Sequence, residues 1–212
     1  MEFIAPEIDE YCAEHTSPET EILAKLNRET HAKVLQARML SGHLQGRFLA
    51  MLSQMIQPSN ILEIGTYTGY SALCLAEGLK ENGKLITLDI NEELENFVRG
   101  FFKESPLNDK IDFRIGNALE MIPTLTQTFD LVFIDADKLN YTNYYDLVFE
   151  KVRQGGYIIS DNVLWSGKVV DKTKNDKDTL AIRAFNHKLH NDIRVENILL
   201  PIRDGLMIVR KV

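Results

Sequence analysis

Oxygen-bearing side chains stand at two points of the sequence where an apolar segment ends. Asp135 ends the segment 130–135, and Asp161-Asn162 follows the segment 156–160. If both segments are parallel strands, their carboxyl ends meet at one edge of a sheet and the three side chains converge there. Three oxygen donors without a neighbouring Cys or His favour a hard cation, with Mg²⁺ as the first expectation and Ca²⁺ or Mn²⁺ as alternatives. In the competing interpretation, Asp161-Asn162 caps a turn and Asp135 contacts a cofactor.

Lys138 is the residue closest to these ligands that could move a proton. It follows Asp135 by three residues and stands at the start of a predicted helix, from which its side chain could face the same point. A metal ion beside it would disfavour the charged ammonium by like-charge repulsion. Lys138 is therefore a candidate general base for a phenolic hydroxyl. The ordinary alternative is a solvated surface lysine.

Aromatic side chains stand near the same positions in the sequence. Trp165 comes three residues after Asn162 and either flanks a flat substrate or belongs to the core. Tyr141, Tyr144 and Tyr145 lie on the helix predicted over 140–152, where they either wall a cofactor pocket or pack against the sheet.

A glycine-bearing turn follows the apolar segment 61–64 and reads Glu63-Ile-Gly-Thr-Tyr-Thr-Gly-Tyr-Ser71. Gly65 and Gly69 allow a tight turn and the close approach of a ligand. Glu63 occupies the place of the first glycine in the dinucleotide fingerprint, which argues against a pyrophosphate ligand. S-adenosylmethionine carries an ammonium that Glu63 could attract and a carboxylate that suits Ser71 at a helix N-terminus. The alternative is an ordinary turn beside a solvated glutamate.

Two further strand ends could complete an adenosine site. Asp89 ends the segment 84–89, from which a carboxylate can accept hydrogen bonds from both ribose hydroxyls. Its other possible role is to cap the next helix, and the two roles are compatible. Ala118, which follows the segment 111–115, leaves space for an adenine ring, although a loop without function fits it equally well.

Short apolar segments alternate with amphipathic ones from residue 60 onward. This alternation predicts a mostly parallel sheet covered by helices on both faces, the doubly wound α/β class. The link 201–204 is too short for a parallel crossover, so the last strand should run antiparallel. Strands are expected over 61–64, 84–89, 111–115, 130–135, 156–160, 194–199 and 205–210. Helices are expected over 70–79, 91–103, 119–125, 140–152 and 179–191, and within 1–57, where one helix should start after Ser17 and another should end before Pro58.

The bulk composition fits one soluble domain. The chain has 212 residues, of which 44% are hydrophobic, and its formal net charge of -7 argues weakly against a large nucleic-acid surface. No apolar run approaches the roughly 20 residues of a membrane span, and residues 1–10 lack the apolar stretch of a signal peptide. Cys12 and Cys74 are interpreted as structural thiols. We expect one cytoplasmic domain over 1–212, with N-terminal helices over 1–57 and a Rossmann-like core over 58–212.

The ordered set of motifs resembles the cation-dependent O-methyltransferases, the group that contains caffeoyl-CoA O-methyltransferase and, more distantly, catechol O-methyltransferase. The resemblance runs from about Arg38 to the C-terminus. It rests on the glycine-bearing turn quoted above, on Ile134-Asp-Ala-Asp-Lys138 with Asn140-Tyr141 and Tyr144 behind it, and on Asp161-Asn-Val-Leu-Trp165. It implies a homodimer, metal ligation by Asp135, Asp161 and Asn162, and Lys138 as the base. It also implies cofactor binding by Ser41, Glu63, Gly65, Thr66, Ser71, Asp89, Ala118, Asp137 and Tyr144.

Two stretches depart from the plant enzymes of that group. Ser166-Gly167 replaces their Asn-Gly pair after the Trp, and the stretch 40–45 differs from theirs. Both border the acceptor pocket in the family, so the resemblance does not carry an acyl-CoA acceptor over to this chain.

The motifs and the resemblance together predict an O-methyltransferase that depends on S-adenosylmethionine and a divalent metal. The expected acceptor is a catechol-like small molecule with vicinal hydroxyls, with Asp135 and Lys138 as catalytic residues and Trp165 as a substrate contact. The main alternative is methylation of a hydroxylated uridine in tRNA by the same chemistry. A non-catalytic binding protein is disfavoured by the presence of Lys138 and all three ligand types. An NAD-dependent oxidoreductase is disfavoured by the missing first glycine.

Overall fold

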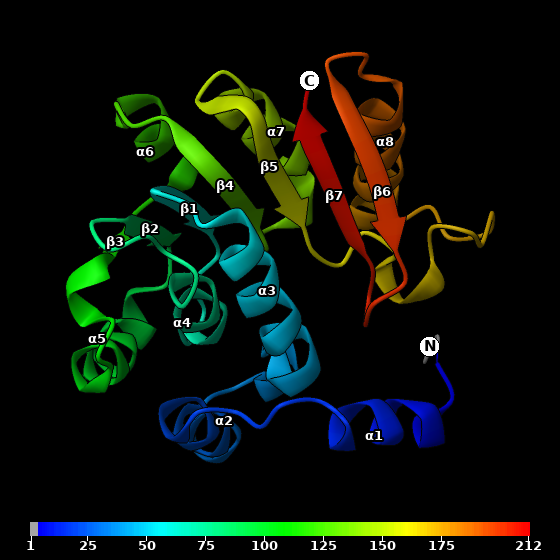
Figure 1. Ribbon diagram of the computed structural model, residues 1–212. Coiled ribbons are helices and arrows are strands. Elements are labelled where there is room, and N and C mark those ends of the chain that lie inside the picture. Colours follow the sequence, from blue (N-terminus) through cyan, green and yellow to red (C-terminus); the bar gives the residue numbers. More distant parts are fainter. Residues whose placement is uncertain (1–3) are drawn as a thin grey trace.

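The computed structural model describes residues 4–212 and contains one seven-stranded sheet (Figure 1). The strand order is β3-β2-β1-β4-β5-β7-β6. The first five strands in the chain pair in parallel, whereas β7 runs antiparallel to both of its neighbours, as the short link 201–204 predicts. The strands are β1 (Asn60–Ile64), β2 (Lys84–Asp89), β3 (Ile111–Ile115), β4 (Phe129–Ile134), β5 (Val152–Ser160), β6 (Val195–Leu200) and β7 (Leu206–Lys211).

Helices cover both faces of this sheet, which confirms the doubly wound α/β class. One core lies under α2 (Glu21–Lys33), α3 (Gly42–Ile56), α4 (Tyr70–Ala76) and α5 (Glu95–Glu104), and the other under α6 (Ala118–Thr124), α7 (Tyr141–Phe149) and α8 (Lys177–Asn191). α1 (Pro6–Glu14) has no buried residue. Short 3-10 turns complete the chain as η1 (Ala37–Met39), η2 (Glu92–Leu94), η3 (Asn108–Lys110), η4 (Lys138–Asn140) and η5 (Trp165–Gly167).

The apolar segments that form β1, β2 and β4 are nearly continuous because these strands bury both of their faces. Ile61 and Leu62 follow one another in β1, are both fully buried, and belong to the cores on opposite faces. Fully burying a side chain of this size contributes roughly 1.5–3 kcal/mol to folding. Two-sided burial therefore explains why these strands do not alternate between apolar and polar residues.

The predicted helix start after Ser17 is wrong, because α2 begins at Glu21 with Thr20 as the preceding residue. The side chain of Glu19 accepts hydrogen bonds from Tyr70 and Asn27. His43 is hydrogen-bonded to the carbonyl of Ser17. These tertiary contacts hold the segment outside the helix, although its local sequence is that of a helix start. The predicted break before Pro58 is confirmed, since α3 ends at Ile56.

β5 and α7 also differ from the predicted bounds. β5 begins at Val152, four residues before the predicted start, because Val152 pairs with Phe129 of β4. α7 consequently ends at Phe149 and does not reach residue 152. Residues 1–3 of the predicted N-terminal helical stretch lie outside the described residues. No helix between residue 4 and the C-terminus is both long enough and apolar enough to cross a membrane.

The register of the parallel strands brings their carboxyl ends to one edge of the sheet. Ile64 pairs with both Leu88 and Ile134, and Ile134 pairs in turn with Ser160. The ladder continues one residue further, because the backbone amides of Gly65, Asp135 and Asp161 donate to carbonyls of the neighbouring strands β2, β1 and β4, respectively. The loops that follow these strands are thus neighbours in space, and they carry most of the candidate site residues.

Candidate active site

Gly65 stands where the turn after β1 crosses the loop after β4. Its φ of +102° favours glycine, and a Cβ atom there would lie 1.9 Å from the backbone oxygen of Asp135. Gly69 also has a positive φ, and a Cβ atom would lie 2.6 Å from the ring of Phe102. The two glycines therefore allow the predicted cofactor turn to lie directly against the loop that carries Asp135.

Glu63 is completely buried in β1 beneath this turn. One of its oxygens accepts a hydrogen bond from Thr87, and the other has no hydrogen-bond partner among the described residues. Burial raises the pKa of Glu63 to about 8, and the nearby charges of Asp135 and Asp89 act in the same direction. A buried carboxyl group with a free oxygen favours a ligand that brings a positive charge.

The other predicted cofactor residues lie at adjoining strand ends. Both carboxylate oxygens of Asp89 accept backbone hydrogen bonds, one from Tyr67 at 2.7 Å and one from Asn91 at 2.9 Å. Asp89 therefore joins the turn after β1 to the turn after β2, and its side chain stays partly exposed. It is not the cap of the next helix, because Asn91 occupies that position in η2. The end of β3 lies alongside, because the amide of Gly116 donates to the carbonyl of Asp89. Ala118, two residues further, opens α6 and is largely buried.

Three hydroxyl-bearing residues of the predicted set are buried around the turn. Thr66 shares a hydrogen bond with Thr87, the residue that also contacts Glu63. Ser71 lies in the first turn of α4 and is 7% exposed. Ser41 precedes α3 and is 6% exposed. Thr66 thus lies in the turn that follows β1, Ser71 lies in the helix after that turn, and Ser41 lies just before α3.

Asp137 and Tyr144 form one unit after β4. The Tyr144 hydroxyl donates to one carboxylate oxygen of Asp137, and the Asn140 amide donates to the other at 2.6 Å. Asp137 is exposed, whereas Tyr144 is buried in α7, and burial raises the pKa of Tyr144, with the Asp137 hydrogen bond adding to it. Tyr144 therefore fixes the orientation of an otherwise exposed carboxylate.

Lys138 is not the solvated lysine of the ordinary alternative, since it is only 9% exposed. Its Nζ donates to Asp135 Oδ1 at 3.0 Å, to Asn162 Oδ1 at 2.8 Å and to the Tyr141 hydroxyl at 2.6 Å. An ammonium thus bridges oxygens of two of the three predicted metal ligands. Those oxygens converge on a place that suits a positive charge.

Asp161 completes the predicted ligand set and is almost fully buried. Its Oδ2 accepts a hydrogen bond from the Gln45 side chain at 2.6 Å, and its Oδ1 accepts one from the backbone amide of Asn162 at 2.6 Å. Burial raises the pKa of Asp161 to about 7, and the charge of Asp135 adds to the effect. Asn162 has a φ of +58°, a conformation that asparagine tolerates better than most residues.

These residues fit a hard cation by the chemistry of their donors. Two carboxylates and one amide oxygen supply three hard ligands, and the buried negative charge favours a cation. Within residues 4–212 no cluster of three or more His, Cys, Asp and Glu side chains is arranged as a metal site. The proposed set is not such a cluster, because only two of its three donors are carboxylates and the third is the amide oxygen of Asn162.

Trp165 lies between the two interpretations drawn from its sequence position. It has a φ of +49°, is partly exposed, and packs against the core beneath α7 and α8. Its indole centre lies 5.8 Å from Lys138 Nζ and 5.7 Å from Lys168 Nζ. In the part of the chain that the structure describes, its buried Nε1 has no hydrogen-bond partner. The ring is thus near the candidate base while one edge belongs to the core.

Sequence reasoning missed two residues that shape this site and the role of a third. Gln45 contacts Asp161 from α3, and Arg203, in the link before β7, contacts Gln45. Tyr141, which was expected to line a cofactor pocket or to pack, holds Lys138 and the Asp161 carbonyl with its hydroxyl. Gln45 had a partial signal, because it occupies the buried stripe of α3, four residues before Leu49. Arg203 gave none, since it stands in a short polar link.

Comparison with known proteins places this architecture among methyltransferases. Residues 13–212 match the family model described as O-methyltransferase. Caffeoyl-CoA O-methyltransferase 2 of Eucalyptus globulus is 40% identical over 199 residues, which cover 87% of this chain and 80% of the relative. An O-methyltransferase of Bacillus cereus in complex with SAH (S-adenosylhomocysteine) superposes with a TM-score of 0.90 at 32% identity, covering 97% of both chains. An O-methyltransferase of Streptomyces achromogenes in complex with SAM (S-adenosylmethionine) gives 0.88 at 27% identity, covering 97% of this chain and 96% of the other.

Proposed function

This chain belongs to the family of S-adenosylmethionine-dependent O-methyltransferases, and we propose that it requires a divalent cation and methylates a catechol-like small molecule. The observation that carries this proposal is the convergence of Asp135, Asn162 and Lys138 beside Asp161. A reaction that uses a cation and moves a proton gives all four side chains a role. Mg²⁺ is the expected cation, because the donors are hard oxygen ligands.

The cofactor half of the proposal is supported by the free oxygen of buried Glu63. The sulfonium cofactor carries an ammonium at its methionine end, and that charge would compensate the carboxylate that burial disfavours. Asp89 is expected to receive the ribose, with Ser41, Gly65, Thr66, Ser71, Ala118, Asp137 and Tyr144 forming the remaining contacts. The similar protein from Bacillus cereus is described with SAH bound, which supports this ligand for the present chain.

Asp135, Asp161 and Asn162 would hold the cation, which when bound supplies Lewis-acid polarisation that makes the acceptor hydroxyl more acidic. The like charge of a bound cation would favour the neutral amine of Lys138. In that form Nζ would take the proton that the acceptor oxygen releases as this oxygen gains the methyl group, leaving S-adenosylhomocysteine. Tyr141 fixes the position of Nζ through its 2.6 Å hydrogen bond. Trp165, close to Nζ, is expected to flank the ring of the acceptor. Holding both reactants in one geometry supplies much of the rate.

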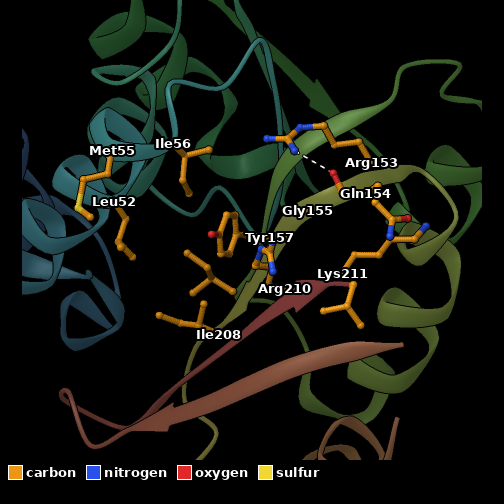
Figure 2. A pocket seen from close by; sticks show the side chains of 12 residues that line it. Leu52, Met55, Ile56, Arg153, Gln154, Gly155, Tyr157, Ile208, Arg210 and Lys211 are labelled. Atoms are coloured by element: carbon orange, nitrogen blue, oxygen red, sulfur yellow. Dashed lines mark hydrogen bonds between the residues drawn. The ribbon is translucent and has the colours of Figure 1, made fainter. Parts of the chain in front are cut away.

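A homodimer is part of the same proposal, because a groove in the described part of the chain leaves apolar side chains partly exposed beside basic ones. Figure 2 shows a groove in which Leu52, Met55 and Ile56 of α3 face Tyr157 and Ile208 of the sheet. Met55 is 76% exposed. Burial of this face against a second copy would remove apolar surface from water. Light scattering should give the mass of two chains, and Met55→Glu should shift it toward one.

The experiment that tests the activity is methyl transfer from labelled S-adenosylmethionine to protocatechuate or caffeate. The assay is run with Mg²⁺ and with excess EDTA. We expect transfer that depends on the metal. Transfer at the full rate in EDTA would refute the role of the cation, and intact cofactor binding without transfer to any vicinal diol would refute the catechol-like acceptor.

Asp135→Ala gives the corresponding test in the protein itself. Its side chain is 22% exposed, so its removal should leave the sheet intact while activity is lost. Circular dichroism and the affinity for SAH serve as controls for folding. Full activity of this variant would contradict the proposed metal site.

A further inference from the structure

Gln45 is one of the two polar side chains that α3 buries, the other being Ser53. It is 0% exposed and donates through Nε2 to Asp161 Oδ2 at 2.6 Å. The two residues are 116 positions apart in the chain. Because a carboxylate can only accept, the amide must turn its NH₂ group toward Asp161, and its oxygen must face away.

Arg203 stands on the other side of the same amide. Its Nη1 approaches Gln45 Oε1 at 3.5 Å and donates to the carbonyls of Leu40, at 2.8 Å, and Ser41. A guanidinium can only donate, so it favours the amide orientation that Asp161 also requires. The positive charge is thereby kept one side chain away from the carboxylate and does not form an ion pair with it.

Both elements that carry this contact are held firmly in place. At Gly46, next to Gln45, a Cβ atom would lie 2.5 Å from the ring of Tyr70, so α3 packs directly on α4. At Gly205 a Cβ atom would lie 2.5 Å from the side chain of Leu164, and the Gly205 carbonyl accepts from the Val163 amide at 3.1 Å. The link before β7 is therefore joined to the loop that follows Asp161.

We propose that Gln45 is a positioning residue for Asp161, held in the required orientation by Arg203. Its neutral amide occupies one lone pair of Oδ2 and fixes the rotation of the carboxylate without cancelling its charge. The remaining lone pairs stay available for a cation. Partners of this kind commonly tune metal affinity by about 10–100-fold. The inference rests on the proposed metal site and adds a residue on a different element to it.

A purely structural role is the competing explanation, since any buried carboxylate needs hydrogen-bond partners. The two roles differ in what a variant should lose. A structural role predicts lower stability with unchanged cation affinity in the folded fraction. A positioning role predicts weaker cation binding even where the protein is fully folded.

Gln45→Met tests this difference, because methionine keeps the length of the side chain and removes the donor. Binding of Mn²⁺ is followed by electron paramagnetic resonance of the free ion, together with the affinity for SAH and the melting temperature. We expect Mn²⁺ binding about 10–100-fold weaker than in the wild type, with SAH affinity retained. Arg203→Met should weaken Mn²⁺ binding in the same direction and by less.

Ser53→Ala is the matched control on the same helix. Ser53 is also fully buried, and its hydroxyl donates to the Leu75 carbonyl at 2.6 Å, away from Asp161. This variant should lose stability and keep Mn²⁺ affinity. If Gln45→Met does not fold, Gln45→Asn keeps the amide but shortens its reach, and it should show the same loss.

The outcomes separate the two proposals. Wild-type affinity for Mn²⁺ in folded Gln45→Met or Gln45→Asn overturns the role of Gln45 alone and leaves the metal site standing. An equal loss in Ser53→Ala also overturns it, since a general softening of α3 would then explain the result. A wild-type protein that binds no Mn²⁺ removes the metal site itself, and with it this inference.

Discussion

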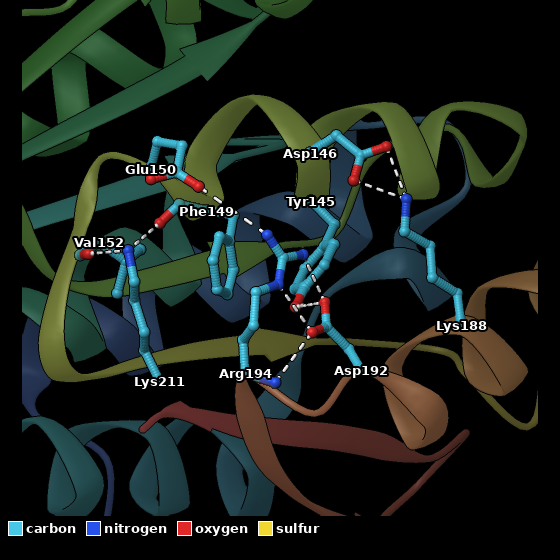
Figure 3. Close-up of polar contacts among 9 residues, drawn as sticks. All are labelled: Tyr145, Asp146, Phe149, Glu150, Val152, Lys188, Asp192, Arg194 and Lys211. Atoms are coloured by element: carbon cyan, nitrogen blue, oxygen red, sulfur yellow. Dashed lines mark hydrogen bonds and ion pairs between the residues drawn. The ribbon is translucent and has the colours of Figure 1, made fainter.

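Two groups of charged side chains lie at opposite edges of the sheet and are organised in opposite ways. At the carboxyl ends of the strands, Glu63 and Asp161 are buried, Asp135 is partly exposed, and Lys138 pairs with Asp135 at 3.0 Å. At the amino ends (Figure 3), Arg194 lies 2.6 Å from Asp192 and 3.9 Å from Glu150, and Lys188 lies 2.6 Å from Asp146. The first edge therefore has more carboxyl groups than paired cations, whereas the second places each of these carboxylates beside a cation.

The pKa values follow this division. Burial raises the pKa of Glu63 and of Asp161, whereas the hydrogen bonds from Arg194 hold the pKa of Asp192 well below its usual range. Buried unpaired charge costs stability, and exposed pairs contribute about 0–1 kcal/mol each. Folding alone gives no reason to retain the first arrangement. A ligand that brings positive charge, such as the proposed cation or the ammonium of the cofactor, would give one.

The largest expected effect on activity follows from replacing Lys138 at the first edge, with the replacement of Lys188 at the second edge as its comparison. Lys138→Met should lower kcat by about 10²–10⁴-fold, because the proposed general base is lost. Lys188→Met removes the partner of Asp146 at the other edge and should leave kcat unchanged. Steady-state kinetics at saturating Mg²⁺ compare the two variants. Near wild-type turnover in Lys138→Met would remove the functional half of the comparison.

Two tyrosines on α7 sharpen the contrast within a single helix. Tyr141 and Tyr145 are both 0% exposed and both pack edge-on against Phe185, with centroids at 5.3 Å and 6.4 Å. The Tyr141 hydroxyl contacts Lys138, and the Tyr145 hydroxyl donates to Asp192 at 2.9 Å. One turn of helix thus separates a hydroxyl of the site from a hydroxyl of the charge-paired edge.

Replacing each tyrosine by phenylalanine should therefore have different consequences. Each substitution should cost about 0.5–1.5 kcal/mol of stability, the net worth of a buried hydrogen bond. Tyr141→Phe should in addition lower kcat by about 10-fold, which corresponds to one such bond lost in the transition state. Chemical denaturation and kinetics on both variants provide the test. Equal kinetics in the two variants would show that Lys138 needs no positioning by Tyr141.

The part of the site that strand ends supply could be predicted from the sequence. Asp135 and Asp161 are 26 positions apart, yet they meet because parallel strands in register present their carboxyl ends together, as Ile134 opposite Ser160 shows. In a regular parallel sheet, the place of a residue within its strand determines which residues of the neighbouring strands lie beside it. The same regularity made the order of strands and helices predictable, although the start of β5 and the end of α7 were misplaced by a few residues.

The rest of the site depends on packing that no local pattern records. Gln45 reaches Asp161 only because Gly46 lets α3 lie against Tyr70. Arg203 contacts Gln45 from the link 201–204, whose sequence indicates a turn and nothing about this contact. The helix expected to start after Ser17 is wrong for the same reason, since the hydrogen bonds of Glu19 to Tyr70 and Asn27 outweigh the local helical preference. Contacts between irregular segments can be predicted only when the overall fold is already known.

The pH dependence of stability should also differ between the two edges, beginning with Glu63. Its pKa rises on folding from 4.5 to about 8, so the folded state holds this proton more tightly than the unfolded state. The cofactor-free protein should therefore lose stability as the pH rises from about 4.5 to about 8, relative to Glu63→Gln. Each kcal/mol corresponds to about 2–4 °C in the melting temperature of a chain of this size.

Calorimetry of the wild type and Glu63→Gln across this pH range measures the difference directly. Titration with SAH in buffers of different ionisation enthalpy supplies a second readout, because binding of the ligand's ammonium should release the Glu63 proton near pH 7. Parallel melting curves for the two proteins would show that Glu63 is already ionised without ligand. The pKa of Glu63 would then not be raised, and the contrast between the two edges would rest on Asp161.

The smallest effect is expected at Asp192, and its sign is opposite. Folding lowers the pKa of Asp192, chiefly through Arg194, so its contribution is present above the ordinary value of 3.8 and is lost as the pH falls through the folded value. Asp192→Asn should thus be slightly less stable than the wild type at neutral pH and should approach it in acid. Melting curves from pH 7 downward through pH 3.8 measure the onset of this convergence. A gap that widens in acid would mean that Arg194 does not hold Asp192 ionised, and the two edges would no longer differ in kind. A gap that begins to close while activity stays unchanged would separate the stabilising charge pairs from the proposed site.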